Sequence, residues 1–191
     1  MKKLLSLLSI VCLTSSLSAN YIDINQGTDS TETSVSVDMY VKNMRTVKKV
    51  DLSFDYIDHD VNGKLYSFLI KADNYSQKNK YLKLTLGAKI VMNDSSKEGS
   101  NYLSIPIGLE VDGIINSNRN FPIGLRLSAY YADSILTLKD SEKYLEYRAE
   151  VYGMISKNFQ LYTGVKNIET DLKSTSVEYD SGVYAGAKFI F

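Results

Sequence analysis

The feature that most constrains the fold is the final segment, Tyr184–Phe191, which alternates in character up to a terminal phenylalanine. A soluble protein gains little from a bulky ring on its last residue, because chain ends usually fray into water. The last strand of a transmembrane β-barrel must instead pair with the first strand and face lipid. The ending therefore indicates a membrane barrel, with Phe189 and Phe191 toward lipid and Gly186 and Lys188 toward the lumen.

The beginning of the chain is typical of a secretory signal peptide. Two lysines precede a short apolar stretch, and small residues follow it as far as Ala19. A membrane-spanning helix needs about 20 apolar residues, which this stretch does not reach. We expect residues 1–19 to be a signal peptide and residues 20–191 to form one domain. Because the only cysteine, Cys12, lies in the signal, the exported chain has no thiol for a disulfide or a metal.

The composition is compatible with a barrel and excludes other classes of protein. The 22 basic and 22 acidic residues balance, so no net charge attracts nucleic acid. No apolar run of membrane-spanning length follows the signal, which excludes a helical membrane protein. A membrane barrel alternates between lipid-facing and lumen-facing residues and therefore has a soluble-looking composition. The 15 tyrosines suit a strand-rich protein with aromatic girdles.

Alternation of apolar and polar residues predicts an all-β fold, a transmembrane antiparallel up-and-down β-barrel of about ten strands. In 82–92 every second residue is apolar, and the segment is long enough for a tilted spanning strand. Ten is an even number, so both termini of the exported chain lie on the same, periplasmic side of the membrane. Eight strands are the alternative if two weak candidates belong to loops. The ten predicted strands are 20–26, 34–42, 47–57, 64–73, 80–92, 101–114, 121–132, 144–155, 159–168 and 177–191.

The connections between these strands alternate in length. We expect short periplasmic turns and longer, more acidic external loops such as 27–33 and 169–176. The longest external loop, 133–143, contains apolar residues that would let it fold over the barrel mouth. Pro106 lies within a strong predicted strand. Because a closed barrel has no edge where a missing N–H is tolerated, we expect a local bulge there.

The residues opposite the apolar faces predict a densely charged lumen. Glu146, Arg148 and Glu150 lie on one strand face, and with Arg126 and Glu110 they form a predicted lumen charge cluster. Buried charges must pair, so the lumen should be filled or very narrow. A soluble lipocalin-like barrel, with the apolar set inside, is the alternative. The remaining charges predicted on the lumen face are Asp38, Asp51, Asp55, Asp112, Lys42, Lys49, Lys83, Lys89, Lys166 and Lys188.

The last eight residues also resemble the recognition signal of bacterial outer-membrane proteins. That signal has a polar or aromatic residue, then glycine, then apolar residues with an aromatic end, and Tyr184, Gly186, Phe189 and Phe191 occupy its positions. The resemblance implies a bacterial outer-membrane location and the barrel-assembly machinery as a partner during biogenesis. Outer-membrane lipids and lipopolysaccharide would surround the barrel.

Within that class the chain resembles the YfaZ-type outer-membrane proteins. The similarity extends over most of the exported chain and is strongest in four segments. It implies where the protein is located rather than how it acts. The four segments are Leu103–Val111, Tyr130–Asp133, Glu142–Tyr152 and Tyr162–Lys166.

The sequence contains no recognisable catalytic, cofactor-binding or metal-binding pattern. His59, the only histidine, lies in a predicted loop between two aspartates, and we interpret it as part of an exposed polar turn. Asp58, Asp60 and Asn62 have the spacing of calcium ligands, but the distal acidic residue of an EF-hand is missing and a solvated turn is expected.

These observations predict a non-enzymatic, monomeric outer-membrane barrel with a structural or surface-interaction role. A narrow channel and a lipid-modifying barrel enzyme are the alternatives.

Overall fold

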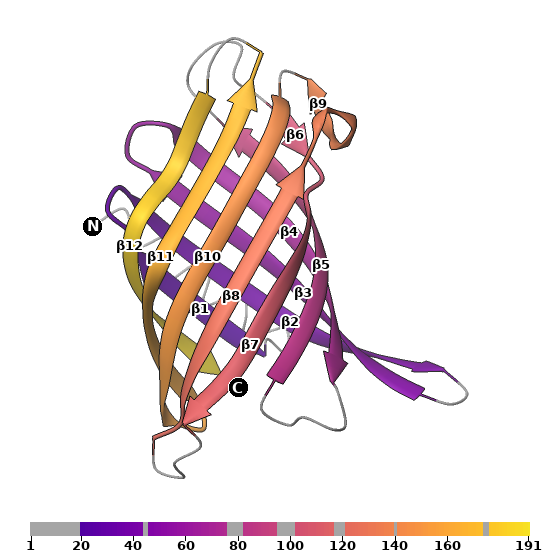
Figure 1. Cartoon of the computed structure of the whole chain (residues 1–191), viewed down its shortest axis with the longest axis vertical. Coiled ribbons are helices and arrows are strands. Elements are labelled where there is room, and N and C mark those ends of the chain that lie inside the picture. The colour runs from indigo at the N-terminus through magenta and orange to yellow at the C-terminus, as the bar shows by residue number, and fades with distance from the viewer. Residues whose placement is uncertain are drawn as a thin grey trace.

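The computed structural model shows a closed antiparallel barrel of ten strands, with two short extra strands at one end (Figure 1). The predicted signal peptide lies outside the described residues. In the described part of the chain, no helix is long and apolar enough to cross a membrane. The structure describes residues 20–43, 46–75, 82–94, 102–116, 121–139, 141–173 and 176–191. The strands of the barrel are β1 (Tyr21–Gln26), β2 (Ser30–Asn43), β3 (Thr46–His59), β4 (Gly63–Tyr75), β5 (Leu82–Asp94), β7 (Ile107–Asn116), β8 (Ile123–Ala132), β10 (Ser141–Ser156), β11 (Phe159–Leu172) and β12 (Ser176–Ile190).

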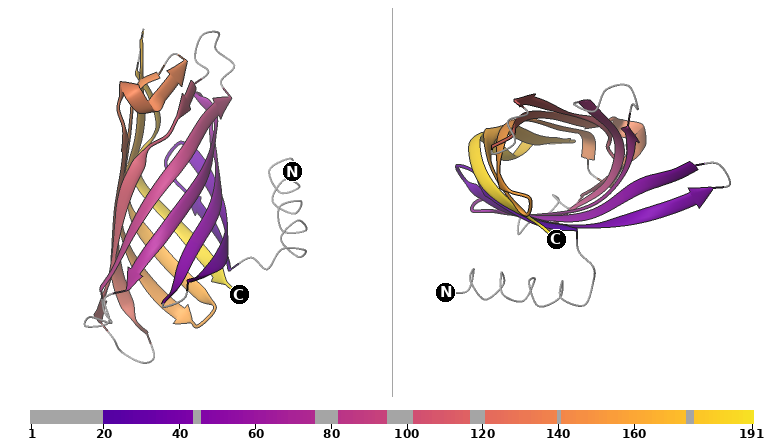
Figure 2. Two further views of the ribbon diagram at one scale, coloured as in Figure 1. Left: turned by 90° about the vertical axis from the view of Figure 1, so that its right-hand side faces the viewer. Right: turned by 90° about the horizontal axis from the view of Figure 1, so that it is seen from below.

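The barrel closes where its first and last strands meet. Strand β1 pairs with β12, with Tyr21 opposite Ile190. All the remaining barrel strands pair with their neighbours in an up-and-down order, and β4 pairs with β5. The ring is plain in the view along the barrel, where the β2–β3 hairpin projects away from it (Figure 2). The predicted ten-stranded barrel is confirmed, and the alternative of eight strands is wrong.

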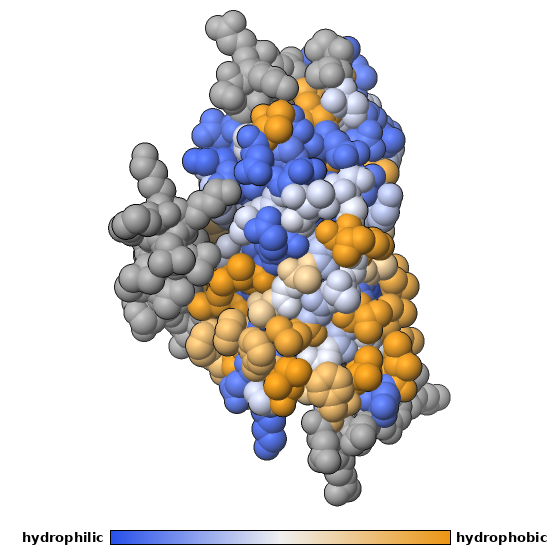
Figure 3. All heavy atoms as spheres, turned by 90° about the vertical axis from the view of Figure 1, so that its left-hand side faces the viewer, coloured by the Kyte–Doolittle hydropathy of each residue, from blue (hydrophilic) through white to orange (hydrophobic). Residues whose placement is uncertain are grey.

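The apolar faces of the strands point outward. Along β5, exposed Leu86 alternates with buried Thr85 and Lys89, as the period of a strand requires. The outward apolar side chains form a belt around the half of the barrel that holds the termini, and a hydrophilic band lies beyond it (Figure 3). The belt therefore faces lipid and the charged side chains face the lumen, so the lipocalin-like alternative is wrong. The end with the termini is the periplasmic end.

Tyrosine rings fill the lumen where the neighbouring strand carries glycine. A Cβ atom at Gly186 would lie 2.4 Å from the ring of Tyr162, and one at Gly124 would lie 2.2 Å from the ring of Tyr152. A side chain at either position would displace the ring, since real Cβ contacts are never so short. Pairing a small residue with a large one across strands lets side chains occupy a small barrel without voids.

The predicted irregularity at Pro106 takes the form of a break in the wall. The predicted strand 101–114 is divided into β6 (Tyr102–Ser104) and β7. Strand β7 pairs with β8, whereas β6 pairs with β9 (Thr137–Lys139). The carbonyl of Pro106 still accepts a hydrogen bond from Lys89 N at 2.8 Å. Proline has no N–H to donate, so the wall changes partner at this residue.

The expectation of longer external loops is wrong at three of these links. Three of the external links are only three residues long, namely 27–29, 60–62 and 173–175. The strands run past the apolar belt into the polar band, where both faces are polar and alternation disappears. The segment 133–143 does not form a separate lid. Its 3-10 helix η1 (Ser134–Leu136) and β9 extend the wall beside β6, and Leu136 packs against the buried residues at this end of the lumen.

Candidate functional site

The external end of the lumen is filled by a group of buried apolar and aromatic side chains, here called the external cluster. The rings of Tyr102 and Tyr179 lie 6.2 Å apart between centroids. Thr170 Oγ1 donates to the Tyr102 hydroxyl at 2.9 Å, and Asn93 Nδ2 donates to the Tyr179 hydroxyl at 2.8 Å. The external cluster is Ile57, Leu65, Val91, Tyr102, Ala132, Tyr144, Ile168, Leu172 and Tyr179.

An irregularity in β12 aims two consecutive side chains into the lumen. The pairing of β11 with β12 shifts register between Ile168 and Glu169, so that Tyr179 and Asp180 are both buried. A bulge re-aims side chains in this way. Tyr179 joins the external cluster, and Asp180 contacts the ammonium of Lys166.

Below the external cluster lies a network of buried ion pairs, here called the upper network. Lys166 Nζ is 2.7 Å from Asp180 Oδ2 and 3.2 Å from Glu32 Oε2, and its side chain is fully buried. Arg148 bridges Glu32 at 2.8 Å and Glu146 at 2.9 Å. Every member has an opposite charge within reach, as buried charges require. The members are Glu32, Lys89, Glu146, Arg148, Lys166 and Asp180, with Lys89 Nζ 2.8 Å from Glu146 Oε1.

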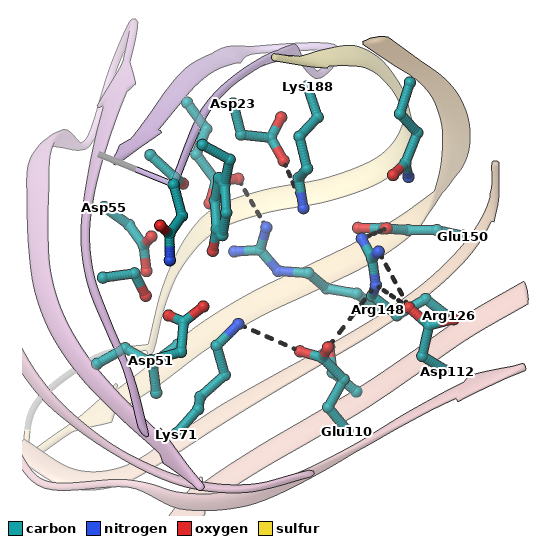
Figure 4. Close-up of a pocket in the computed structure, with 18 of the residues that line it drawn as sticks. Asp23, Asp51, Asp55, Lys71, Glu110, Asp112, Arg126, Arg148, Glu150 and Lys188 are labelled. Atoms are coloured by element: carbon teal, nitrogen blue, oxygen red, sulfur yellow. Dashed lines mark hydrogen bonds and ion pairs between the residues drawn. The ribbon is translucent and has the colours of Figure 1, made fainter. Parts of the chain in front are cut away.

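A second network, here called the lower network, is centred on Arg126. Its guanidinium lies 3.1 Å from Asp112 Oδ2 and 2.9 Å from Glu150 Oε2. Glu110 lies 3.7 Å from the same guanidinium and also contacts Lys71 at 3.6 Å (Figure 4). The hydroxyls of two tyrosines complete the network, since Tyr152 donates to Asp112 and Tyr184 donates to Glu150, each at 2.6 Å.

All five members of the predicted charge cluster lie on the lumen wall, but they do not form one group. Arg148 and Glu146 belong to the upper network, whereas Arg126, Glu150 and Glu110 belong to the lower network. Sequence reasoning missed four lumen charges: Asp23, Glu32, Lys71 and Asp180. Alternation in β4 is a signal that identifies Lys71 as a lumen residue, whereas Glu32 lies in the predicted loop 27–33. The side chains of Lys42 and Lys49 are outside the described part of the structure.

Both networks border a polar cavity of about 450 Å³. Asp51 and Asp55 line one side of it, and Arg126 and Lys188 point into it from other strands (Figure 4). Its lining includes Asn20 and Phe191, so it reaches the periplasmic mouth of the barrel. Lys188 Nζ is 3.2 Å from Asp23 Oδ2 on β1, and Tyr162 donates a hydrogen bond to the same carboxylate.

The residues of the predicted assembly signal occupy different environments. Tyr184 is buried in the lumen beside Glu150, and Gly186 lies beneath the ring of Tyr162. Phe189 is exposed on the face opposite the lumen-facing Lys188, and Phe191 is exposed at the periplasmic mouth, where it also borders the polar cavity. Recognition of these residues by the assembly machinery stays a prediction.

His59 has a structural place in the β3–β4 turn. Its Nδ1 accepts backbone N–H groups from Val61 and Asn62, each at 3.0 Å. The Asn62 side chain donates to the carbonyl of Glu178 at 2.6 Å, which ties the turn to β12. Over the described ranges, no three His, Cys, Asp or Glu side chains gather as a group that could hold a metal.

A closed barrel with an apolar belt outside and charges inside defines an integral protein of the bacterial outer membrane. The chain belongs to the YfaZ family, because the family model described as YfaZ precursor matches residues 1–191.

Among solved structures, the chain is similar to the "KdgM porin", with 12% sequence identity, a TM-score of 0.49, and coverage of 91% of this chain and 99% of that chain. A similar match is "KdgM porin in complex with disordered oligogalacturonate", with 12% identity, a TM-score of 0.48, and coverage of 90% and 99%. A third is "NanC porin structure in rhombohedral crystal form", with 11% identity, a TM-score of 0.43, and coverage of 90% and 97%. A comparison with curated proteins gives no match.

Proposed function

We propose that the protein is a closed outer-membrane barrel with a structural or surface-interaction role, and that it is not an enzyme. The observation that carries this proposal is the external cluster. Tyr102, Tyr144 and Tyr179 are almost completely buried across the external end of the lumen, directly above the upper network. Packed rings above paired charges leave the polar cavity open toward the periplasm rather than through the barrel.

The external rim supports a surface-interaction role. The wall continues beyond the apolar belt as a polar band, extended by β6, η1 and β9 (Figures 1 and 3). In this extension the side chains of Ile135 and Leu138 are 88% and 52% exposed. Exposed apolar side chains close together in sequence on a polar rim, outside the lipid belt, are suited to contact with another surface molecule.

The test is the conductance of the refolded protein in planar bilayers. We expect no conductance steps for the wild type at any voltage. Replacing Tyr102 and Tyr179 together by alanine should produce steps, because it removes two rings from the external cluster. The matched control replaces the lipid-facing Tyr131 and Tyr147 by alanine, which should leave the bilayer silent. Regular steps from the wild type would contradict the closed state.

A narrow channel is the second candidate function, and the charged cavity favours it. A cavity of about 450 Å³ lined by acids and bases is the kind of interior that selects ions. On this reading the external cluster moves aside, and wild-type recordings would show brief openings whose frequency rises when Tyr102 is replaced. Prolonged recordings without any opening would exclude it.

The lipid-modifying enzyme is the least supported candidate. His59 uses Nδ1 to hold a turn, so it does not present that atom to a substrate. Mass spectrometry of lipid A from cells with and without the protein should show the same species. A species that depends on the protein would contradict the non-enzymatic proposal.

A further inference from the structure

Two neighbouring pairs of the β2–β3 ladder place four oxygen-bearing side chains side by side on the lumen wall. Asp38 lies opposite Asp51, and Ser36 lies opposite Ser53. Directly opposed side chains have Cβ atoms about 4.5–5.5 Å apart, and like charges in this position repel each other. The fold therefore places two carboxylates side by side on the lumen wall.

Three of these side chains have buried oxygens without a hydrogen-bond partner in the described part of the chain. They are Ser36 Oγ, Ser53 Oγ and Asp51 Oδ1. The exposed fractions of the side chains are 0%, 1% and 9%. Buried polar atoms in native proteins nearly always have a partner, so a group of them points to a bound water or ion. Since Ser53 and Asp51 both line the cavity, that ligand would sit at its edge.

The base opposite Asp51 on the neighbouring strand is directed elsewhere. Lys71 lies opposite Asp51 on β4, but its ammonium contacts Glu110 on β7 at 3.6 Å, and Figure 4 shows it pointing that way. Asp51 itself forms no ion pair among the described residues.

The described residues that line the cavity carry more acids than bases. Among them, nine carboxylates face six basic side chains, and this balance favours cations over anions. The carboxylates belong to Asp23, Glu32, Asp38, Asp51, Asp55, Glu110, Asp112, Glu146 and Glu150, and the bases to Lys71, Lys83, Lys89, Arg126, Arg148 and Lys188.

We propose that Asp38 and Asp51 bind a hydrated hard divalent cation, Mg²⁺ or Ca²⁺, at the periplasmic mouth of the lumen. Hard cations prefer carboxylate and neutral oxygen ligands, and Mg²⁺ is commonly held by one or two carboxylates while it keeps several waters. The hydroxyls of Ser36 and Ser53 bind those waters, and the cavity has room for them. The cation enters from the periplasm, because the cavity reaches the terminal residues of the barrel.

The site lies at the base of the projecting β2–β3 hairpin. Strand β1 stops pairing with β2 at Ser36, and β4 stops pairing with β3 at Val50, whereas β2 and β3 continue to pair as far as Asn43 and Thr46 (Figure 2). A cation between Asp38 and Asp51 would bridge β2 and β3 at the point where the hairpin leaves the barrel. Cation binding should therefore stabilise this hairpin.

Terbium luminescence of the refolded full chain tests the proposal. Tb³⁺ occupies sites of hard divalent cations, and only tyrosine can sensitise it because the chain has no tryptophan. Tyr21 lines the same cavity. We expect saturable emission that Mg²⁺ or Ca²⁺ displaces. Asp51→Asn should weaken Tb³⁺ binding at least about tenfold, because it removes one of two charged ligands. Titration calorimetry with Mg²⁺ and with Ca²⁺ separately identifies the preferred ion.

Two controls separate a defined site from a diffuse field. Asp55→Asn removes a charge from the same cavity but from a different rung, and it should change Tb³⁺ affinity less than threefold. Asp171→Asn removes an exposed external acid and should change nothing. Equal losses for Asp51→Asn and Asp55→Asn would overturn the site. The absence of saturable Tb³⁺ binding to the wild type would also overturn the site, and water would then be the partner of the buried oxygens. If Asp51→Asn does not fold, Asp38→Asn serves as the second test, with the same expected loss.

Discussion

Replacing Lys166 by methionine tests whether the upper network stabilises the barrel. The Lys166 ammonium is buried 2.7 Å from Asp180 and 3.2 Å from Glu32. Methionine has a similar length but no charge. After the change, the Asp180 carboxylate still accepts a hydrogen bond from the Ser30 hydroxyl, but it has no basic partner among the described residues. Breaking a buried pair by removing one partner costs about 3–5 kcal/mol. Glu32 keeps Arg148 at 2.8 Å, which places the expected loss near the lower end, about 3 kcal/mol.

The assay is urea unfolding in lipid vesicles, followed by circular dichroism and by the heat-dependent shift in gel mobility. A loss of about 3 kcal/mol lowers the folding equilibrium constant by about two orders of magnitude. The matched control is Lys143→Met, because Lys143 contacts Asp171 at 3.6 Å with both side chains about 40% exposed. Exposed pairs contribute at most about 1 kcal/mol.

A double variant separates the loss of a pair from the loss of volume. Lys166→Met combined with Asp180→Leu removes both charges, and it should regain part of the stability because no unpaired carboxylate remains. If Lys166→Met and Lys143→Met differ by less than about 1 kcal/mol, the network does not stabilise the barrel as the geometry indicates.

Three further predictions concern the wall of the barrel. Deleting Phe191 should lower the amount of folded protein in the outer membrane, whereas Phe191→Tyr should not; a normal level of the deletion variant, measured by fractionation, would contradict the assembly role. Gly186→Ala should lower the urea midpoint because its Cβ would lie 2.4 Å from the Tyr162 ring, and Tyr162→Leu in the same chain should restore part of the loss. Leu161→Arg on the lipid face should lower the free energy of unfolding by about 2–4 kcal/mol in the same assay. Glu142→Arg on the external side should leave it almost unchanged.

The faces of the strands could be predicted because the side-chain period of a strand is independent of its partners. Leu86 outside and Lys89 inside follow from alternation alone. The ends of the strands could not be predicted from alternation. A strand is recognised by this pattern only where one of its faces is apolar, and the external ends of these strands have two polar faces. Beyond the belt, residues such as Glu169 and Asp171 face outward and the strand resembles a loop, although β11 continues to Leu172. Glu32 was missed for this reason.

The pairing of lumen charges needs information that one strand does not contain. Lys89 contacts Glu146, 57 residues later, because the register of several strands brings them to the same height in the lumen. Asp180 contacts Lys166 only because the β12 irregularity turns two successive side chains inward. Sequence reasoning therefore identified which residues are charged and enclosed, whereas their division into two networks required the registers.

The seam between β1 and β12 sets the order in which the barrel can be completed. Strand β1 has only six residues, and it pairs with residues 185–190 at the far end of the chain, while Phe191 N donates to Asn20 O at 2.9 Å. Until β12 has been synthesised, the free edge of β1 lacks its partner, so the ring cannot close during translation. The emerging chain must therefore be kept from pairing with itself or with other chains until its last strand arrives. A chaperone that binds the unfolded chain before membrane insertion must therefore act while the six residues of β1 still lack their partner strand.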